Sequence, residues 1–172
     1  MRALKLKVKG YYMQNKKTLR ATFHQKALAY HTWSAYLSLG IAIVVLPILG
    51  ILGLEANIEL FVLILTIVTH IKAKKMLLAS KMRHVGPILL YVSEALSLLA
   101  IGPFLIEIAI GGEGHLTLGL AVLIILPIRL TSAVFFFLSA KQMKAAYPEM
   151  KMEMQVAKAE FQEAKRAFKK GL

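Results

Sequence analysis

The chain has 172 residues, of which 58% are hydrophobic and 18% charged, with a formal net charge of +13 and no cysteine. Soluble domains carry about 25% charged and roughly 45–50% apolar residues, so the composition excludes an ordinary water-soluble domain and the length excludes several domains. Without cysteine or aspartate, the chain has no disulfide scaffold, thiolate metal site or cysteine nucleophile, and no aspartate for phosphoryl transfer.

Residues 1–34 are predicted to form a basic arm in the cytoplasm or at the membrane interface. They contain eight lysines and arginines. The period-two alternation of Leu4–Lys9 has no partner strand nearby, so this stretch is predicted to be surface-bound or flexible. From Met13 onward, apolar residues at helical spacing predict an amphipathic helix that leads into the first apolar run. These residues are Leu19, Phe23, Ala27 and Tyr30.

Four apolar runs follow, and each is predicted to be a membrane-spanning helix, because such a helix needs about 20 mostly apolar residues. The runs cover residues 35–54, 58–76, 87–110 and 116–140. The second run is the weakest, because only residues 60–71 lack a charge. It can cross the bilayer if Glu59 lies at one interface and the lysines at its end reach the other. Residues 35–140 are therefore predicted to form a four-helix transmembrane domain.

The connections within each pair of runs are very short. Leu54–Asn57 joins the first and second runs, and Gly111–Gly114 joins the third and fourth. Such short connections make consecutive helices antiparallel neighbours. The predicted fold class is an all-α polytopic membrane protein. It has four transmembrane helices in two tight antiparallel hairpins, an N-terminal amphipathic arm and a C-terminal amphipathic cytoplasmic helix.

The distribution of positive charge predicts the orientation. Of the 22 lysines and arginines, 21 fall in the two tails and in residues 72–83, at the end of the second run and in the connection after it, and the two short connections contain none. Because cytoplasmic segments are enriched in these residues, both termini are expected in the cytoplasm and the chain in a plasma or bacterial inner membrane. This topology explains the net charge without nucleic acid, so no nucleic-acid partner is expected.

Basic and aromatic residues near the inner interface predict contacts with the bilayer. Tyr30, Trp33 and Tyr36, at the inner end of the first run, are expected in an aromatic belt. Lysines and arginines beside the apolar runs are expected to contact anionic lipid headgroups of the inner leaflet. They are Lys16, Lys17, Arg20, Lys72, Lys74, Lys75, Lys81 and Arg83.

Small residues and prolines predict local features of the runs. Small residues at four-residue spacing allow close helix approach in lipid. They are Ser34, Ser38 and Ala42 in the first run and Ser93 and Ser97 in the third. Pro47, Pro103 and Pro127 each remove a helical hydrogen bond and are predicted to kink their helices. A static kink is the simpler interpretation, and a hinge that gates a pathway is the alternative.

Residues 141–172 are predicted to form a basic amphipathic helix after Pro148. Apolar residues at alternating spacings of four and three form a heptad seam. The seam comprises Met150, Met154, Ala157, Phe161, Ala164 and Phe168. Two uses remain open: the seam binds a partner subunit or a second copy of the chain, or it lies on the inner leaflet with its phenylalanines inserted.

Two charged residues, Glu94 and Arg129, lie deep in the third and fourth runs. Glu94 is 11 residues from Arg83 and Arg129 is 12 from Lys141, so both lie about 17 Å from the cytoplasmic end, near the middle of the bilayer. A lone charge at this depth costs about 2.5–3.5 kcal/mol, and pairing offsets much of that cost. An intramembrane ion pair between Glu94 and Arg129 is therefore predicted. It is either a structural clasp or part of a substrate, proton or anion pathway.

The sequence contains no phosphate-binding glycine loop and no nucleophile–base pattern, so neither an enzyme nor a cofactor is expected. His31, His70 and His84 are interpreted as interfacial residues, and no metal site is predicted. The first functional hypothesis is a non-enzymatic subunit of a larger membrane assembly. The alternatives are a small homo-oligomeric transporter or channel with Glu94 and Arg129 in the pathway, and a holin-like protein that permeabilises the membrane.

Overall fold

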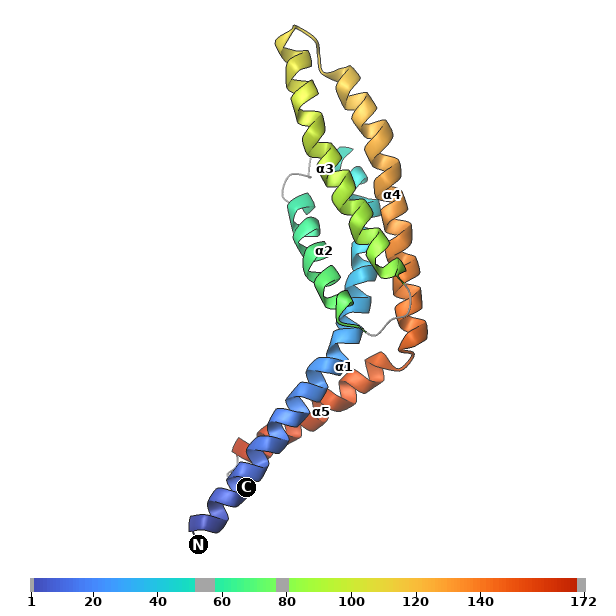
Figure 1. Cartoon of the computed structure of the whole chain (residues 1–172). Helices are drawn as coiled ribbons and strands as arrows, with labels where there is room; N and C mark the ends of the chain where they lie inside the picture. Colours follow the sequence, from blue (N-terminus) through green and yellow to red (C-terminus); the bar gives the residue numbers. More distant parts are fainter. Residues whose placement is uncertain (1, 52–57, 77–80, 170–172) are drawn as a thin grey trace. The chain divides into compact units, whose positions relative to one another are not determined.

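The computed structural model describes residues 2–51, 58–76 and 81–169, and the side chains of residues 16–47, 58–76 and 81–166. The described residues form five helices and no strand (Figure 1), which confirms the all-helical prediction. The helices are α1 (Arg2–Ile51), α2 (Ile58–Lys74), α3 (Met82–Ala109), α4 (His115–Ala146) and α5 (Met150–Lys169). The predicted turn at 54–57 lies outside the described residues.

Three of the described helical segments are long and apolar enough to cross a membrane. They are Lys16–Pro47 within α1, Met82–Ala109 and His115–Ala146. Their composition agrees with the prediction of a membrane protein. Helix α2 is shorter, with 17 residues, so the three spans predicted from residues 35–54, 87–110 and 116–140 are the ones that length and composition support.

The helices extend beyond the apolar runs. Helix α1 begins at Arg2 and includes Leu4–Lys9, where a surface-bound or flexible arm was predicted. Leucine and lysine are both good helix formers, and the helical backbone of this stretch continues that of the following segment. Helix α4 likewise continues to Ala146, six residues past the predicted end of its run. An apolar run therefore predicts the part of a helix that can contact lipid, but it does not predict the residue at which the helix ends.

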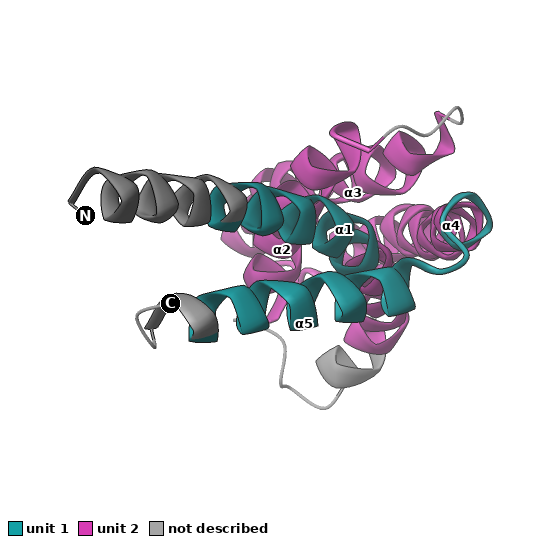
Figure 2. Cartoon of the chain, turned by 90° about the horizontal axis from the view of Figure 1, so that it is seen from below, with its two compact units in different colours: residues 1–32, 144–172 teal, residues 33–143 magenta. Residues whose placement is uncertain are grey.

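The described chain divides into two compact units (Figure 2). Unit 1 comprises residues 1–32 and 144–172, and unit 2 comprises residues 33–143. In unit 1 the first part of α1 packs against α5. The rings of Phe23 and Phe161 are stacked with their centroids 6.1 Å apart, and Lys26 Nζ lies 3.4 Å from Glu153 Oε2. The α5 seam therefore lies against the chain's own N-terminal segment.

The core of unit 2 includes Tyr36, which was predicted for the interfacial aromatic belt. Its side chain is fully buried, its ring lies 5.1 Å from that of Phe136, and its hydroxyl donates a 2.6 Å hydrogen bond to the carbonyl of Arg83. The belt prediction is therefore wrong for Tyr36, because the residue lies on the face of α1 that packs inward with Leu39 and Ile43. Ser38, on the predicted small-residue face, is exposed.

Small residues bring α3 and α4 close together near the start of α3. Ser132 donates a 2.8 Å hydrogen bond from Oγ to the carbonyl of Gly86, and a Cβ at Gly86 would lie 3.1 Å from the Phe136 ring. At the far ends of these helices the chain reverses through Gly111 and Gly114, which have φ of 84° and 74°. Between these two ends, Glu94 of α3 lies close enough to Arg129 of α4 to form an ion pair.

Candidate functional site

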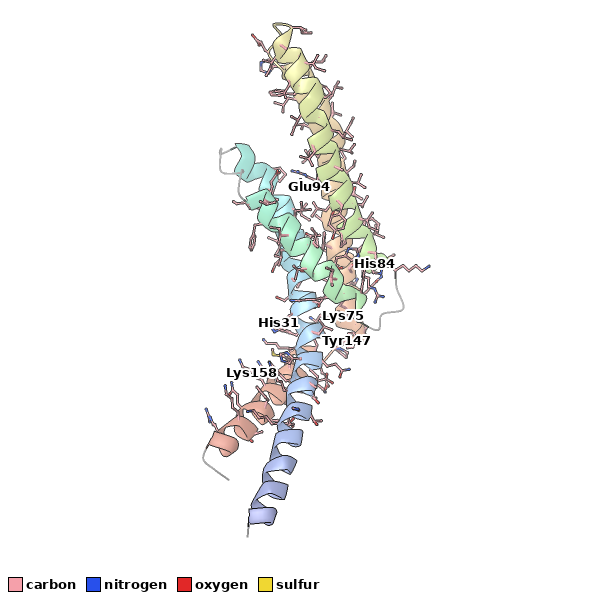
Figure 3. All side chains as sticks on the ribbon, turned by 60° about the vertical axis from the view of Figure 1, so that its left-hand side comes forward. His31, Lys75, His84, Glu94, Tyr147 and Lys158 are labelled. Carbon is pink, nitrogen blue, oxygen red and sulfur yellow. The ribbon has the colours of Figure 1, made fainter. Side chains whose placement is uncertain are left out.

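In unit 2, Arg129 of α4 forms ion pairs with two glutamates, one from α2 and one from α3. Its Nη1 donates a 2.6 Å hydrogen bond to Glu59 Oε1 at the start of α2, and its Nη2 donates a 2.9 Å hydrogen bond to Glu94 Oε1 in α3. The side chains are 13%, 33% and 21% exposed for Arg129, Glu59 and Glu94. We call these three residues the Arg129 cluster. Figure 3 labels Glu94 partway along α3.

The structure thus brings Glu94 and Arg129 together and adds a partner that sequence reasoning missed. Glu59 was predicted at a membrane interface, because it precedes the apolar core of its run. The number of residues between Glu59 and the end of its run does not reveal how α2 is aligned with its neighbours. The packing of α2 against α3 determines which residues lie opposite Arg129. The available signal was the charge count, because Glu59 is the only carboxylate in α2 and Glu94 is one of two in α3, the other being Glu107 near its end.

The composition of the cluster leaves it with an unbalanced charge. Two carboxylates face one guanidinium, so the cluster carries a net charge of −1 when all three groups are ionised. An uncompensated charge in an apolar environment is costly, and a bound proton or cation removes that cost. Arg129 Nε is buried with no hydrogen-bond partner among the described atoms, so the guanidinium is not fully satisfied by its two glutamates.

A cavity of about 700 Å³ ends at this cluster. One face of α4 lines it from Thr117 to Arg129, a length of about 18 Å at the helix rise. Ala100 and Phe104 of α3 lie among the apolar lining residues, and Ser97 adds a hydroxyl near the charged end. The cavity is a mostly apolar space with a charged floor, which is the usual composition of a small-ligand site.

A second polar group, the histidine cluster, lies nearer the start of α3. His84 Nδ1 and His70 Nε2 are 2.9 Å apart, and His70 Nδ1 lies 3.2 Å from the Tyr91 hydroxyl. Arg83 donates from Nε to His84 Nε2 at 3.1 Å and from Nη1 to the carbonyl of Met76 at 2.7 Å. The histidines were interpreted separately as interfacial residues. Sequence reasoning missed their pairing, although the two residues lie near the adjoining ends of consecutive helices.

The other predicted site residues are the prolines of the apolar runs and the basic residues beside them. Pro47, Pro103 and Pro127 lie inside α1, α3 and α4, and Pro47 lines the cavity. Lys17, Arg20, Lys72, Lys74, Lys75 and Lys81 are exposed and Lys16 is partly exposed. Arg83, which was predicted to contact lipid, instead uses its guanidinium inside unit 2.

The seam residues of α5 belong to unit 1. Met150 and Ala157 are buried, and Met154, Phe161 and Ala164 are partly buried. The side chain of Phe168 lies outside the described residues. Among the described residues, no group of three or more potential metal ligands is found. Comparison with protein-family models, with curated proteins and with solved structures finds no match to this chain.

Proposed function

We propose that the chain is a small non-enzymatic transport protein of the plasma or inner membrane. It crosses the membrane four times, with both termini in the cytoplasm, and its pathway for a small cation passes the Arg129 cluster. The observation that carries the proposal is the cavity of about 700 Å³ whose lining includes Glu59 and Arg129, with Glu94 bonded to the same guanidinium.

The charge of the cluster supports a cation as the transported species. A structural clasp between two helices needs one residue of each sign, whereas here Arg129 bonds to Glu59 and Glu94 together. Ionised groups inside a membrane are rare and characteristically line ion or proton pathways. The second carboxylate supplies the negative charge that a passing cation needs, and Arg129 keeps the site from holding that cation too tightly.

The distribution of apolar surface supports the four-span topology. Helix α2 exposes Leu60, Phe61 and Ile64, and such large side chains suit contact with lipid. Its 17 residues cover about 26 Å, slightly less than the hydrocarbon thickness of about 30 Å. A short span of this kind is accommodated by local thinning of the bilayer and by snorkelling of Lys72 and Lys74 at its end.

Flux through purified protein in liposomes tests the proposal. Vesicles that contain the full chain are loaded with fluorescent reporters for H⁺, Na⁺ or K⁺, and a gradient of each ion is imposed in turn. The expected result is flux of at least one of these cations above that of empty vesicles, lowered at least tenfold by Glu94→Gln. Glu113→Gln is the matched control, because Glu113 is 83% exposed in the α3–α4 turn. Absence of cation flux in the unmodified protein would sink the proposal.

A non-enzymatic subunit of a larger membrane assembly is the second candidate. The observation that favours it is the exposed apolar surface of α3 and α4, where Leu98, Leu99 and Leu123 are each about 70% exposed. Lipid or partner helices can cover this surface. The native mass of the protein after extraction in a mild detergent separates the two candidates. Co-purification with other membrane proteins at a fixed ratio favours the assembly, and a closed homo-oligomer favours the transporter.

A further inference from the structure

We infer that the histidine cluster is a proton relay, and that the cation which reaches the Arg129 cluster is a proton drawn from the cytoplasmic side. This inference rests on the proposed function and names its substrate. The relay runs from His84 through His70 to Tyr91, and it ends three residues from Glu94 on α3.

Arg83 sets the direction of the relay. Its guanidinium can only donate, so His84 Nε2, 3.1 Å away, must accept. A neutral His84 then carries its proton on Nδ1 and donates it to His70 Nε2 at 2.9 Å. Neutral His70 in turn carries its proton on Nδ1, which lies 3.2 Å from the Tyr91 hydroxyl. One fixed donor therefore assigns the tautomers of both rings, and every bond points from the start of α3 toward Tyr91.

Each transfer along this chain conserves protons. A proton from water binds His84 Nε2 in place of the Arg83 hydrogen bond, and His84 releases its Nδ1 proton to His70 Nε2. His70 releases its own Nδ1 proton to the Tyr91 oxygen, and Tyr91 passes its phenolic proton to a carboxylate oxygen of Glu94 through a bridging water. Both rings then exchange tautomers to restore the starting state. The step needs no oxidant and no second substrate.

The surroundings favour passage of a proton over its retention. Arg83 bonds to His84, and Lys74 lies one helical turn beyond His70, so two positive charges oppose a lasting imidazolium. Tyr36 of α1 holds the Arg83 carbonyl with its hydroxyl and stays out of the chain of imidazoles. At the other end, the Arg129 cluster has one negative charge in excess, which attracts the proton.

The geometry connects the relay to the cluster on two helices. Tyr91 precedes Glu94 by three residues, so both side chains leave the same face of α3. His70 follows Glu59 by 11 residues, just over three whole turns, which places both on the same face of α2. The buried hydroxyl of Thr66 lies on that face between them. The cavity continues from Glu59 and Arg129 toward the α3–α4 turn, so the relay and the cavity approach the Arg129 cluster from opposite sides.

Proton flux in variant proteoliposomes tests the relay. Under an imposed membrane potential, Tyr91→Phe and His70→Gln are each expected to lower H⁺ flux at least tenfold. His31→Gln is the matched control and is expected to keep the unmodified flux, because His31 is an exposed histidine of unit 1 outside the relay. Tyr91→Phe removes one hydroxyl and preserves the ring, so it distinguishes loss of the relay from loss of the fold.

The outcomes separate this inference from the proposed function. Flux of Na⁺ or K⁺ without H⁺ flux would overturn the relay and leave the transport proposal standing, and absence of all cation flux would overturn both. H⁺ flux that falls in Glu94→Gln but persists in Tyr91→Phe and His70→Gln would show that protons reach the cluster only through the cavity. Nitrogen NMR of ¹⁵N-histidine-labelled protein in nanodiscs gives an independent readout. We expect Nδ1-protonated tautomers at His70 and His84, and dominant Nε2-protonated forms at both would refute the relay.

Discussion

Arg129 bonds to its two glutamates through different nitrogens, Nη1 to Glu59 and Nη2 to Glu94. Each carboxylate therefore has its own donor, and removal of one glutamate leaves the other bond in place. Removal of Arg129 leaves two carboxylates facing each other in an apolar setting. The three residues are thus unequal, and changes at Arg129 are expected to be the most damaging.

Charge reversal at the cluster should show compensation. Arg129→Glu leaves three carboxylates together and Glu94→Arg leaves two cations with one carboxylate, and breaking a buried pair in this way costs about 3–5 kcal/mol. The double variant restores one cation and two carboxylates. We expect it to recover most of the lost stability in a denaturant titration of the protein in detergent micelles. Glu113→Arg, in the exposed turn, should change little. A double variant no more stable than either single variant would contradict the ion pair.

The contact between Glu94 and Arg129 could be predicted because the residues lie 11 and 12 positions from the basic residues at the cytoplasmic ends of their runs. The helix rise converts these nearly equal counts into nearly equal depth in two runs joined by a tight turn. Glu59 could not be placed in the same way. Its position opposite Arg129 depends on how α2 packs against α3, and the sequence does not specify that packing. The contact between His70 and His84 could not be predicted for the same reason, because it depends on the alignment of two helices and not on the spacing of residues within one helix.

At the scale of the helices, the turn between α3 and α4 relies on two glycines for different reasons. Both have positive φ, but a Cβ on Gly111 would meet open space, whereas a Cβ on Gly114 would lie 2.5 Å from the Phe104 ring. Glu107 supports this turn, because its carboxylate accepts hydrogen bonds from the backbone nitrogens of Leu116 and Thr117 at the start of α4. The turn thus links the end of α3 to the start of α4.

Alanine substitutions at the two glycines should separate the cost of a positive φ from the cost of a steric clash. Gly111→Ala carries only the cost of positive φ, about 1–2 kcal/mol. Gly114→Ala adds the clash with Phe104 and should be clearly more destabilising. Gly119→Ala is the control, because a Cβ there meets nothing within 4 Å on a helix, and it should change stability by at most about 1 kcal/mol. Thermal unfolding in detergent compares the three, and equal losses for Gly111 and Gly114 would refute the predicted clash.

The amphipathic face of α5 was predicted to bind a partner or the membrane surface, and the structure places it against α1 in unit 1. Both amphipathic segments were recognised from periodicity. Their mutual packing was not predicted, because a heptad seam specifies an apolar stripe and does not identify the surface that covers it. The available signal was that both amphipathic segments were expected on the same side of the membrane, where they could pack against each other.

Loss of the stacked ring pair should loosen unit 1. Phe161→Ser removes the stacking with Phe23, which contributes about 0.5–1.5 kcal/mol beyond buried area. We expect faster tryptic cleavage after Lys158 and Lys165, with α3 and α4 still protected. Val156→Ser is the control on the same helix, because Val156 is 52% exposed. Equal cleavage rates in the two variants would mean that the seam does not hold α5.

For the molecule as a whole, the proposed topology predicts on which side of the membrane each connection and terminus lies. The chain has no cysteine, so single cysteines introduced at Glu113 and Lys151 can be labelled without background. With four spans and both termini in the cytoplasm, an impermeant thiol reagent should label Glu113→Cys only from outside the cell and Lys151→Cys only from inside. Labelling of both positions from the same side would refute the proposed orientation.

The order of the three charges along the chain also matters during biosynthesis. Glu94 and Glu59 precede Arg129 by 35 and 70 residues. At typical synthesis rates, the guanidinium emerges from the ribosome about 2–7 s after Glu94 and about 4–14 s after Glu59. In the proposed four-span topology, α2 and α3 therefore emerge before the guanidinium that pairs with their glutamates, and α4 is the helix whose arrival completes the Arg129 cluster.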